Sequence, residues 1–152
     1  MFLKLRSNKG FTILELLIVI AVIAILVGIA LPRFKGMKDE GNYAKAKGEM
    51  RTLQTAVESY YLHNANAYPA NISTVTLGGA VPQIIAVSPP DAFGNGTALY
   101  GYGRSPNGNY YAIWSVGVGG TATVTGIDNT GAITGSAGDD IYVTNGTVSS
   151  GG

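Results

Sequence analysis

The sequence predicts an α+β protein in which one long amino-terminal helix carries a small antiparallel sheet on its second half. Three observations support this fold class. Residues 11–31 are almost entirely apolar, residues 33–64 place apolar side chains every three or four positions, and several short β-like segments with turn residues follow residue 97. The chain has 152 residues, which suits one domain with an appendage.

The apolar segment predicts a membrane-spanning helix over residues 11–32. Its 21 residues from Phe11 to Leu31 include one charge, Glu15, and as a helix they would cover roughly 30 Å of hydrocarbon. The three basic residues Lys4, Arg6 and Lys9 precede it, so the amino terminus is expected in the cytoplasm. A conventional signal cleavage after Ala30 is the less favoured alternative, because the segment is longer than a usual signal core.

Residues 33–64 are predicted to form an amphipathic helix. The apolar positions recur with helical spacing and are separated by charged residues; they are Phe34, Met37, Tyr43, Ala46, Met50, Leu53, Val57 and Tyr60 or Tyr61. Tyr68-Pro69 and the preceding asparagines supply a stop near His63 or Asn64. If Pro32 only bends its path, the helix would be about 80 Å long, and half of it needs a bilayer or other subunits to cover its apolar surface.

Residues 65–152 are predicted to contain a loop and a small antiparallel sheet. Segments 98–103 and 109–117 flank a turn at residues 104–108 and predict a hairpin. Weaker strand patterns cover residues 121–126 and 140–144. The tyrosines and Trp114 of the hairpin are expected to pack across strands and not to stack on a ligand.

Composition argues against several classes of function. The chain has no cysteine, which excludes disulfide bonds, thiolate metal sites and a cysteine nucleophile. Beyond residue 70 it has one basic residue, Arg104, against four aspartates, so a nucleic-acid surface is not expected. His63 is the single histidine and lies at the expected helix end. Because no nucleophile elbow, phosphate loop or paired carboxylates appear, we expect no enzymatic activity and no required cofactor.

The stretch Lys9-Gly10-Phe11-Thr12-Ile13-Leu14-Glu15, followed by an apolar run ending in Ala30-Leu31-Pro32, resembles the amino terminus of type IV pilins and type II secretion pseudopilins. The resemblance implies a pilin-like fold. It also implies that residues 1–10 are a cytoplasmic leader, that a prepilin peptidase cuts between Gly10 and Phe11, and that the new amine of Phe11 is methylated.

Within this family the chain is most similar to the major pseudopilins. Residues 53–69 (LQTAVESYYLHNANAYP) and residues 90–94 (PDAFG) resemble their motifs, with Ala92 and Phe93 as departures, and the cysteine pair of many pilins is absent. The resemblance implies an inner-membrane subunit with a periplasmic head. It would polymerise with itself and contact an assembly platform and minor pseudopilins. A surface-fibre type IV pilin is the second interpretation, and a monomeric membrane-anchored binding module is the third.

Glu15 is expected to act in assembly. A charge at the bilayer centre costs about 2.5–3.5 kcal/mol, whereas a free amine on Phe11 would pair with it. The chain's own amine and a neighbour's are both possible partners, and the resemblance implies the neighbour's. Gly28 and Pro32 bracket a turn with weak helix hydrogen bonds, which we expect either to kink at the membrane edge or to melt during assembly.

A calcium site is the remaining expectation. Several major pseudopilins bind calcium in a loop after the sheet, and Gly138-Asp139-Asp140-Ile141 resembles the second half of that loop. In the first half, Val118 lies in a segment that usually carries Asp. Since calcium prefers six to eight oxygens, Asp139 and Asp140 alone supply too few, and a solvated acidic turn is the competing interpretation.

Overall fold

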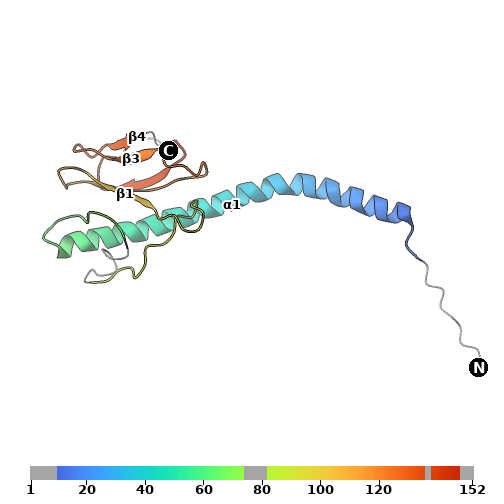
Figure 1. The fold of residues 1–152 in the computed structure, drawn as a ribbon, viewed down its shortest axis with the longest axis horizontal. Coiled ribbons are helices and arrows are strands. Elements are labelled where there is room, and N and C mark those ends of the chain that lie inside the picture. The colour runs from blue at the N-terminus through green and yellow to red at the C-terminus, as the bar shows by residue number, and fades with distance from the viewer. Residues whose placement is uncertain (1–9, 74–81, 136–137, 148–152) are drawn as a thin grey trace, which may run out of the picture. The chain divides into compact units, whose positions relative to one another are not determined.

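The computed structural model describes residues 10–73, 82–135 and 138–147 (Figure 1). Within these residues one helix is followed by short strands. They are α1 (Ile13–His63), β1 (Gly101–Arg104), β2 (Tyr111–Ser115), β3 (Val124–Ile127), β4 (Ile133–Gly135) and β5 (Ile141–Thr144). The chain divides into two units, residues 1–38 and 39–152, so that the first unit contains the beginning of α1 and the second contains its end and all five of these strands.

Helix α1 confirms the predicted long helix. It begins two residues later than expected, at Ile13, and it continues through Gly28 and Pro32. It ends at His63, as predicted, where the N–H of Asn66 donates to the carbonyl of Tyr61 at 3.1 Å. The chain can turn away there because Ala65 and Asn66 both adopt left-handed conformations, with φ of 54° and 56°.

The predicted hairpin is also confirmed. Strands β1 and β2 pair antiparallel with Gly101 opposite Trp114, and β5 pairs with the other edge of β2, giving the order β1-β2-β5. The loop between β1 and β2 is closed by the N–H of Ser105, which donates to the carbonyl of Tyr110 at 2.9 Å. Gly108 takes the positive φ that this turn requires.

The prediction of a single sheet was wrong. Strands β3 and β4 form a separate two-stranded sheet, and β4 was not predicted at all. The ladder between them shifts register between Val124 and Gly126, which is a β-bulge. A bulge interrupts the alternation of inward and outward side chains in β3. The sequence pattern of a regular strand, which repeats every two residues, is therefore weak here.

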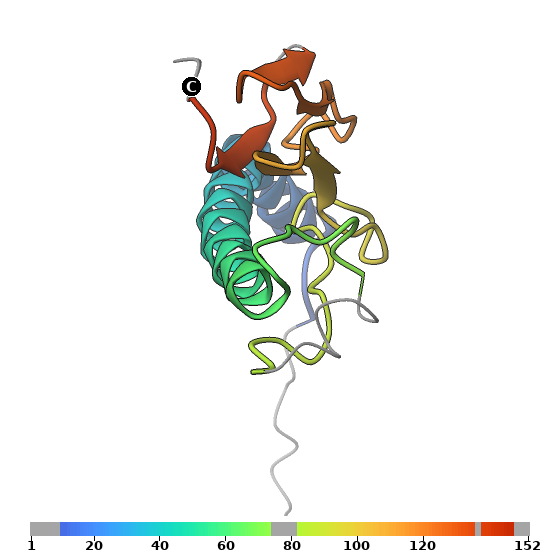
Figure 2. The ribbon, with the colours of Figure 1, turned by 90° about the vertical axis from the view of Figure 1, so that its left-hand side faces the viewer.

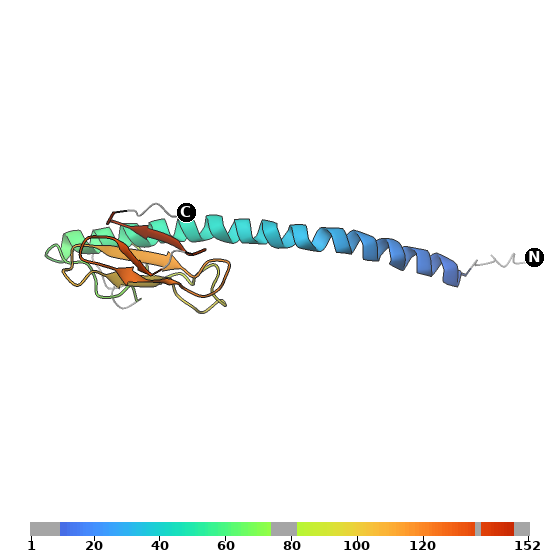
Figure 3. The same cartoon turned by 90° about the horizontal axis from the view of Figure 1, so that it is seen from above.

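The second unit is layered. Its part of α1 contributes Ala46, Met50, Leu53, Ala56 and Val57 to the core. The three-stranded sheet covers this face of the helix, and β3 packs against β1 and β2 on the side of that sheet away from the helix (Figure 2). Seen from above, the strands lie alongside the C-terminal half of α1 (Figure 3).

The buried face of α1 is shorter than the apolar periodicity suggested. Phe34 and Met37 belong to that periodic pattern, yet they are 65% and 70% exposed, and burial begins at Ala46. The spacing of the apolar residues therefore predicts the helix correctly, but it does not predict which of these apolar side chains the sheet covers.

Candidate functional site

The beginning of α1 forms a reciprocal capping box. The hydroxyl of Thr12 accepts a hydrogen bond from the N–H of Glu15 at 3.1 Å, and Oε2 of Glu15 accepts both the N–H and the hydroxyl of Thr12, each at 3.1 Å. This is the Thr-x-x-Glu arrangement that satisfies free N–H groups at a helix start. The sequence contains that signature, and our reasoning about Glu15 missed it.

The cap gives the Glu15 carboxylate a local partner. In the full chain the nitrogen of Phe11 is a peptide amide, so it carries no charge that could pair with the carboxylate. Gly10, Phe11, Thr12 and Glu15 together line one shallow hollow at the start of α1. Cleavage after Gly10 would create an ammonium group on Phe11, four residues before Glu15 in the sequence. The cleavage, the methylation and the pairing remain predictions.

The apolar part of α1 has no cover within the described chain. Residues 11–29 are all exposed, and large side chains such as Ile13, Leu14 and Ile25 keep more than 60% of their surface accessible. By length and composition α1 could cross a membrane. Soluble proteins rarely expose an apolar surface of this extent, so it must contact lipid or other protein chains.

Gly28 and Pro32 lie within this exposed part of α1. Outside its own turn of helix, a Cβ at Gly28 would meet no atom within 4 Å, so no close contact with the rest of the described chain requires glycine there. A glycine in a helix interior is destabilising by roughly 0.5–1 kcal/mol relative to alanine, and Pro32 removes one hydrogen bond from the helix. Helix α1 is continuous through this turn. A kink at the membrane edge and melting during assembly both stay predictions.

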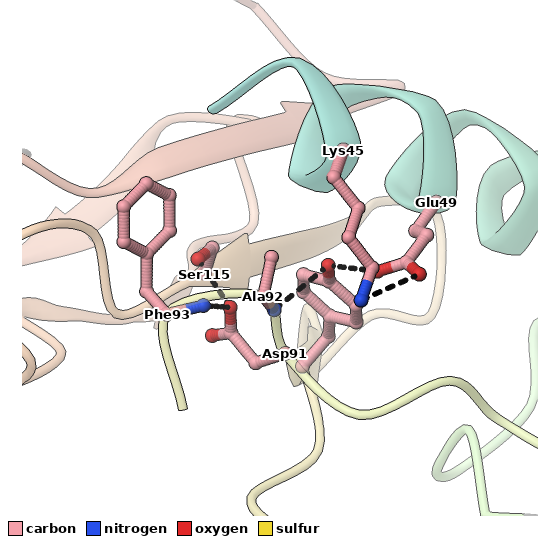
Figure 4. Close-up of polar contacts among 7 residues, drawn as sticks. Lys45, Glu49, Asp91, Ala92, Phe93 and Ser115 are labelled. Carbon is pink, nitrogen blue, oxygen red and sulfur yellow. Dashed lines mark hydrogen bonds and ion pairs between the residues drawn. The ribbon is translucent and has the colours of Figure 1, made fainter. Parts of the chain in front are cut away.

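In the second unit, a buried carboxylate joins the loop after residue 90 to the end of β2 (Figure 4). Asp91 is 2% exposed. Its Oδ1 accepts the hydroxyl of Ser115 at 2.6 Å and the N–H of Phe93 at 3.0 Å, and its Oδ2 accepts the N–H of Val116 at 2.9 Å. The segment PDAFG, which the sequence singled out by resemblance, therefore holds the sheet and loop together.

A second bridge fastens this loop to α1. The hydroxyl of Tyr100 donates to Oε2 of Glu49 at 2.5 Å and accepts the N–H of Ala92 at 3.2 Å (Figure 4). Lys45 completes the group with an ion pair to Oε1 of Glu49 at 3.7 Å. Burial and the bond to Glu49 raise the pKa of Tyr100 well above its ordinary value.

Glu58 makes a third such bridge. The hydroxyls of Tyr111 and Tyr68 donate to its two carboxylate oxygens at 2.7 and 3.3 Å. The rings of Tyr61, Tyr68 and Tyr111 follow one another at centroid distances of 4.4 and 4.8 Å. In the hairpin itself, the ring centroids of Tyr102 and Tyr111 lie 6.2 Å apart, which confirms for these two tyrosines the expected packing across strands. Burial raises the pKa of Tyr68 to about 12.

His63 lies where the sequence placed it, at the exposed C-terminal end of α1. Its Nδ1 is 2.8 Å from the carbonyl oxygen of Ser59. The described residues contain no group of three or more acidic, histidine or cysteine side chains that could hold a metal ion. A helix-end role for His63 agrees with both observations.

The two candidate calcium ligands are already engaged in the fold. Asp139 accepts the N–H of Gly119, which closes the loop after β2. Oδ2 of Asp140 accepts the N–H groups of Thr123 and Val124, both at 2.7 Å. Oδ1 of Asp140, however, is buried without a partner, and a buried carboxylate oxygen of this kind is suited to a cation.

The comparisons with known proteins agree with these features. Residues 5–31 match the family described as the prokaryotic N-terminal methylation motif. The chain is 30% identical over 112 residues to the type II secretion system core protein G of Aeromonas hydrophila, a match that covers 74% of this chain and 76% of that protein. The chain belongs to the type II secretion system core protein G family.

Other matches extend this family assignment. The core protein G of Vibrio cholerae is 29% identical over 124 residues, which cover 80% of each chain. A fimbrial protein of Pseudomonas aeruginosa is 40% identical, but only over 58 residues and 38% of each chain. No solved structure matches the chain. The matches to the core proteins G of Aeromonas hydrophila and Vibrio cholerae thus cover most of the chain, whereas the match to the fimbrial protein covers just over a third of it.

Proposed function

We propose that this core protein G family member is a structural subunit that polymerises into a pilin-like filament of a type II secretion system, and that it has no enzymatic activity. The observation that carries the proposal is the uncovered apolar surface of residues 11–29. A membrane covers that surface before assembly, and the same helices of neighbouring subunits cover it in the filament. Burial of apolar area, at about 25 cal/mol per Å², stabilises either state.

Assembly begins with processing at the inner membrane. A prepilin peptidase removes residues 1–10 and methylates the amine of Phe11. The Glu15 carboxylate, which the capping box holds near Thr12, then becomes the partner of a Phe11 ammonium of a neighbouring subunit. Pairing the two charges offsets the cost of holding a lone carboxylate in hydrocarbon.

The second unit lies on the periplasmic side of the inner membrane in this proposal. It presents a folded head, held on α1 by Glu49 and Glu58, to the outside of the filament. The partners are other copies of the chain, the prepilin peptidase, the inner-membrane assembly platform and minor pseudopilins. After assembly the filament occupies the periplasm.

A type IV pilin of a surface fibre is the second candidate, because the fimbrial protein match reaches 40% identity. That match covers 38% of the chain, against 74% for the core protein G of Aeromonas hydrophila, and therefore favours the secretion subunit. Electron microscopy of cells expressing the chain at its natural level distinguishes the two. Long surface fibres would indicate the pilin, and their absence together with periplasmic filaments would indicate the secretion subunit.

Substitution of Glu15 tests the filament proposal. Glu15→Leu and Glu15→Gln should give subunits that insert in the membrane and are processed but form no filaments, while Glu40→Gln, the matched change at an exposed acid of α1, should assemble normally. Normal filaments from Glu15→Leu would contradict the role of Glu15. A wild-type chain that remains monomeric would instead support an anchored binding module.

We further propose that calcium binds beside the loop after β2. Oδ1 of Asp140 supplies the buried oxygen that has no protein partner, Asp139 is the second acidic ligand, and loop carbonyl groups and water complete the shell. The ion would tie β5 to that loop. Titration calorimetry of calcium into the purified chain, with Asp140→Asn as the control, tests this proposal. Absence of both binding heat and a calcium-dependent melting shift would refute it.

A further inference from the structure

Three basic residues follow the apolar part of α1 directly and have no partner in the described chain. Arg33, Lys35 and Lys38 are all exposed, and none of them makes an ion pair or hydrogen bond through its side chain within the residues that the structure describes. The nearest acids on α1 are Asp39 and Glu40, and neither is paired with them. These three residues are called the basic collar below.

The position of the basic collar is fixed by the length of the apolar helix. From Ile13 to Pro32 the helix rises about 30 Å, which equals the thickness of the hydrocarbon core. Arg33 is the next residue. The collar therefore reaches the level of the lipid headgroups on the side opposite the amino terminus. The long side chains of lysine and arginine can extend their charges toward phosphate groups while their methylene groups stay in the apolar region.

The directions of the three side chains favour lipid over a protein surface. At about 100° per residue, Arg33 projects from the side of α1 opposite Lys35 and Lys38. A protein partner approaches from one side, whereas headgroups surround a membrane helix. Phe34 and Met37, which are 65% and 70% exposed, lie among these charges and are suited to the boundary between headgroups and hydrocarbon.

We propose that the basic collar binds the phosphate groups of acidic phospholipids in the outer leaflet of the inner membrane and so sets the depth of the subunit before assembly. The inference rests on the membrane-anchored state of the proposed function. When the leader is removed, Lys4, Arg6 and Lys9 leave with it, and the collar becomes the group of basic residues nearest the retained apolar helix. Each residue of the collar then contributes to the preference for acidic over neutral lipid.

Nuclear magnetic resonance of the full chain in bicelles tests the proposal. Phosphatidylglycerol is titrated into phosphatidylcholine bicelles while the amide signals of residues 33–38 are followed. We expect saturable shifts that weaken in high salt, and an apparent lipid affinity that falls about 5-fold for each of Arg33→Gln, Lys35→Gln and Lys38→Gln. Arg51→Gln, the same change at an exposed residue further along α1, should leave the shifts unchanged.

Two results would overturn the inference. Shifts that are equal in neutral and acidic bicelles would show that the collar does not select acidic lipid. Shifts that persist in a variant carrying all three glutamine substitutions of the collar would show the same. Shifts that depend on the ratio of protein to lipid, and not on phosphatidylglycerol, would indicate that the collar pairs with Asp39 and Glu40 of a second copy of the chain and not with lipid. The assay measures lipid binding by the uncleaved monomer and does not require filaments. Its outcome is therefore independent of the test of filament formation.

Discussion

Asp91→Asn tests how the second unit is held together. The substitution keeps the size of the side chain but replaces Oδ2, or in the flipped orientation Oδ1, with an NH₂ group. In the native structure Oδ2 accepts the N–H of Val116 at 2.9 Å, and Oδ1 accepts two donors, from Ser115 and Phe93. Whichever way the amide is turned, at least one donor of the loop or of β2 would face another donor.

The expected cost follows from these contacts. A hydrogen bond to a charged acceptor contributes about 1.5–3 kcal/mol, and a buried donor left unpaired costs about 1–3 kcal/mol. Because Asp91 is 2% exposed, water cannot replace the lost bond. We expect Asp91→Asn to lower the free energy of unfolding by about 3 kcal/mol, and Ser115→Ala, which removes a single donor, by about 1 kcal/mol.

Urea denaturation of the full chain in detergent measures this effect. Trp114 is the only tryptophan and lies in β2, so its fluorescence reports the unfolding of the sheet. The midpoint should fall in Asp91→Asn with an unchanged slope. Asp39→Asn is the matched control, since Asp39 is partly exposed on α1. A loss below about 1 kcal/mol, or one equal to that of the control, would refute the role assigned to Asp91.

Four further predictions concern the ends of the helix, the sheet and the tyrosines. Thr12→Val should remove the capping box and speed hydrogen exchange of the first turn of α1, with Thr12→Ser close to wild type; equal exchange in all three would contradict the cap. Gly101→Ala should destabilise the sheet by about 1–3 kcal/mol, because a Cβ there overlaps the indole of Trp114; an unchanged urea midpoint would be the contrary result. Ala65→Gly should raise the free energy of unfolding by about 0.5–1 kcal/mol, since φ is 54° at this residue, and a loss of stability would disprove the strain. Stability should hold up to about pH 10 and then fall as the pH rises toward 12. The reason is that the unfolded chain loses the Tyr68 proton near the ordinary pKa of 10.0, whereas the folded chain keeps it to about 12. Urea midpoints at increasing pH measure this loss of stability, and Tyr68→Phe should make the loss smaller.

The elements that could be predicted are those with a strong local pattern. The first part of α1 is a long apolar run, the part after Pro32 follows a helical period, and stop signals lie near His63 or Asn64. The β1–β2 hairpin is marked by a glycine turn between aromatic strands. Strand β4 could not be found in this way. It has three residues, ends in Gly135, and pairs with β3 across a bulge that breaks the alternation of a regular strand.

The polar bridges of the second unit could not be predicted for a different reason. Glu49 and Glu58 lie between the apolar positions of α1, where a charged residue normally faces water. Both are half-buried. Their hydroxyl donors come from Tyr100 and Tyr111, more than 50 residues further along the chain. A local pattern carries no information about such distant partners.

Glu15 has a partner within the chain that the sequence prediction did not include. The cost of a charge in hydrocarbon predicts only a partner for this carboxylate, namely the amine that cleavage would create. The local signature Thr-x-x-Glu identifies the partner in the uncleaved chain, where Thr12 and Glu15 form a closed capping box. Both arrangements involve the same carboxylate, so the cap describes the uncleaved chain and the ion pair remains the prediction for the assembled one.

In the proposed pathway the apolar helix is kept, processed and packed into a filament. Mass spectrometry of the native protein purified from membranes tests it most directly, because the mass of the amino-terminal peptide identifies both the cleavage site and the methyl group. We predict a chain that begins at Phe11 and carries a methylated amine. A chain that begins at Met1, or one cut after Ala30, would contradict it.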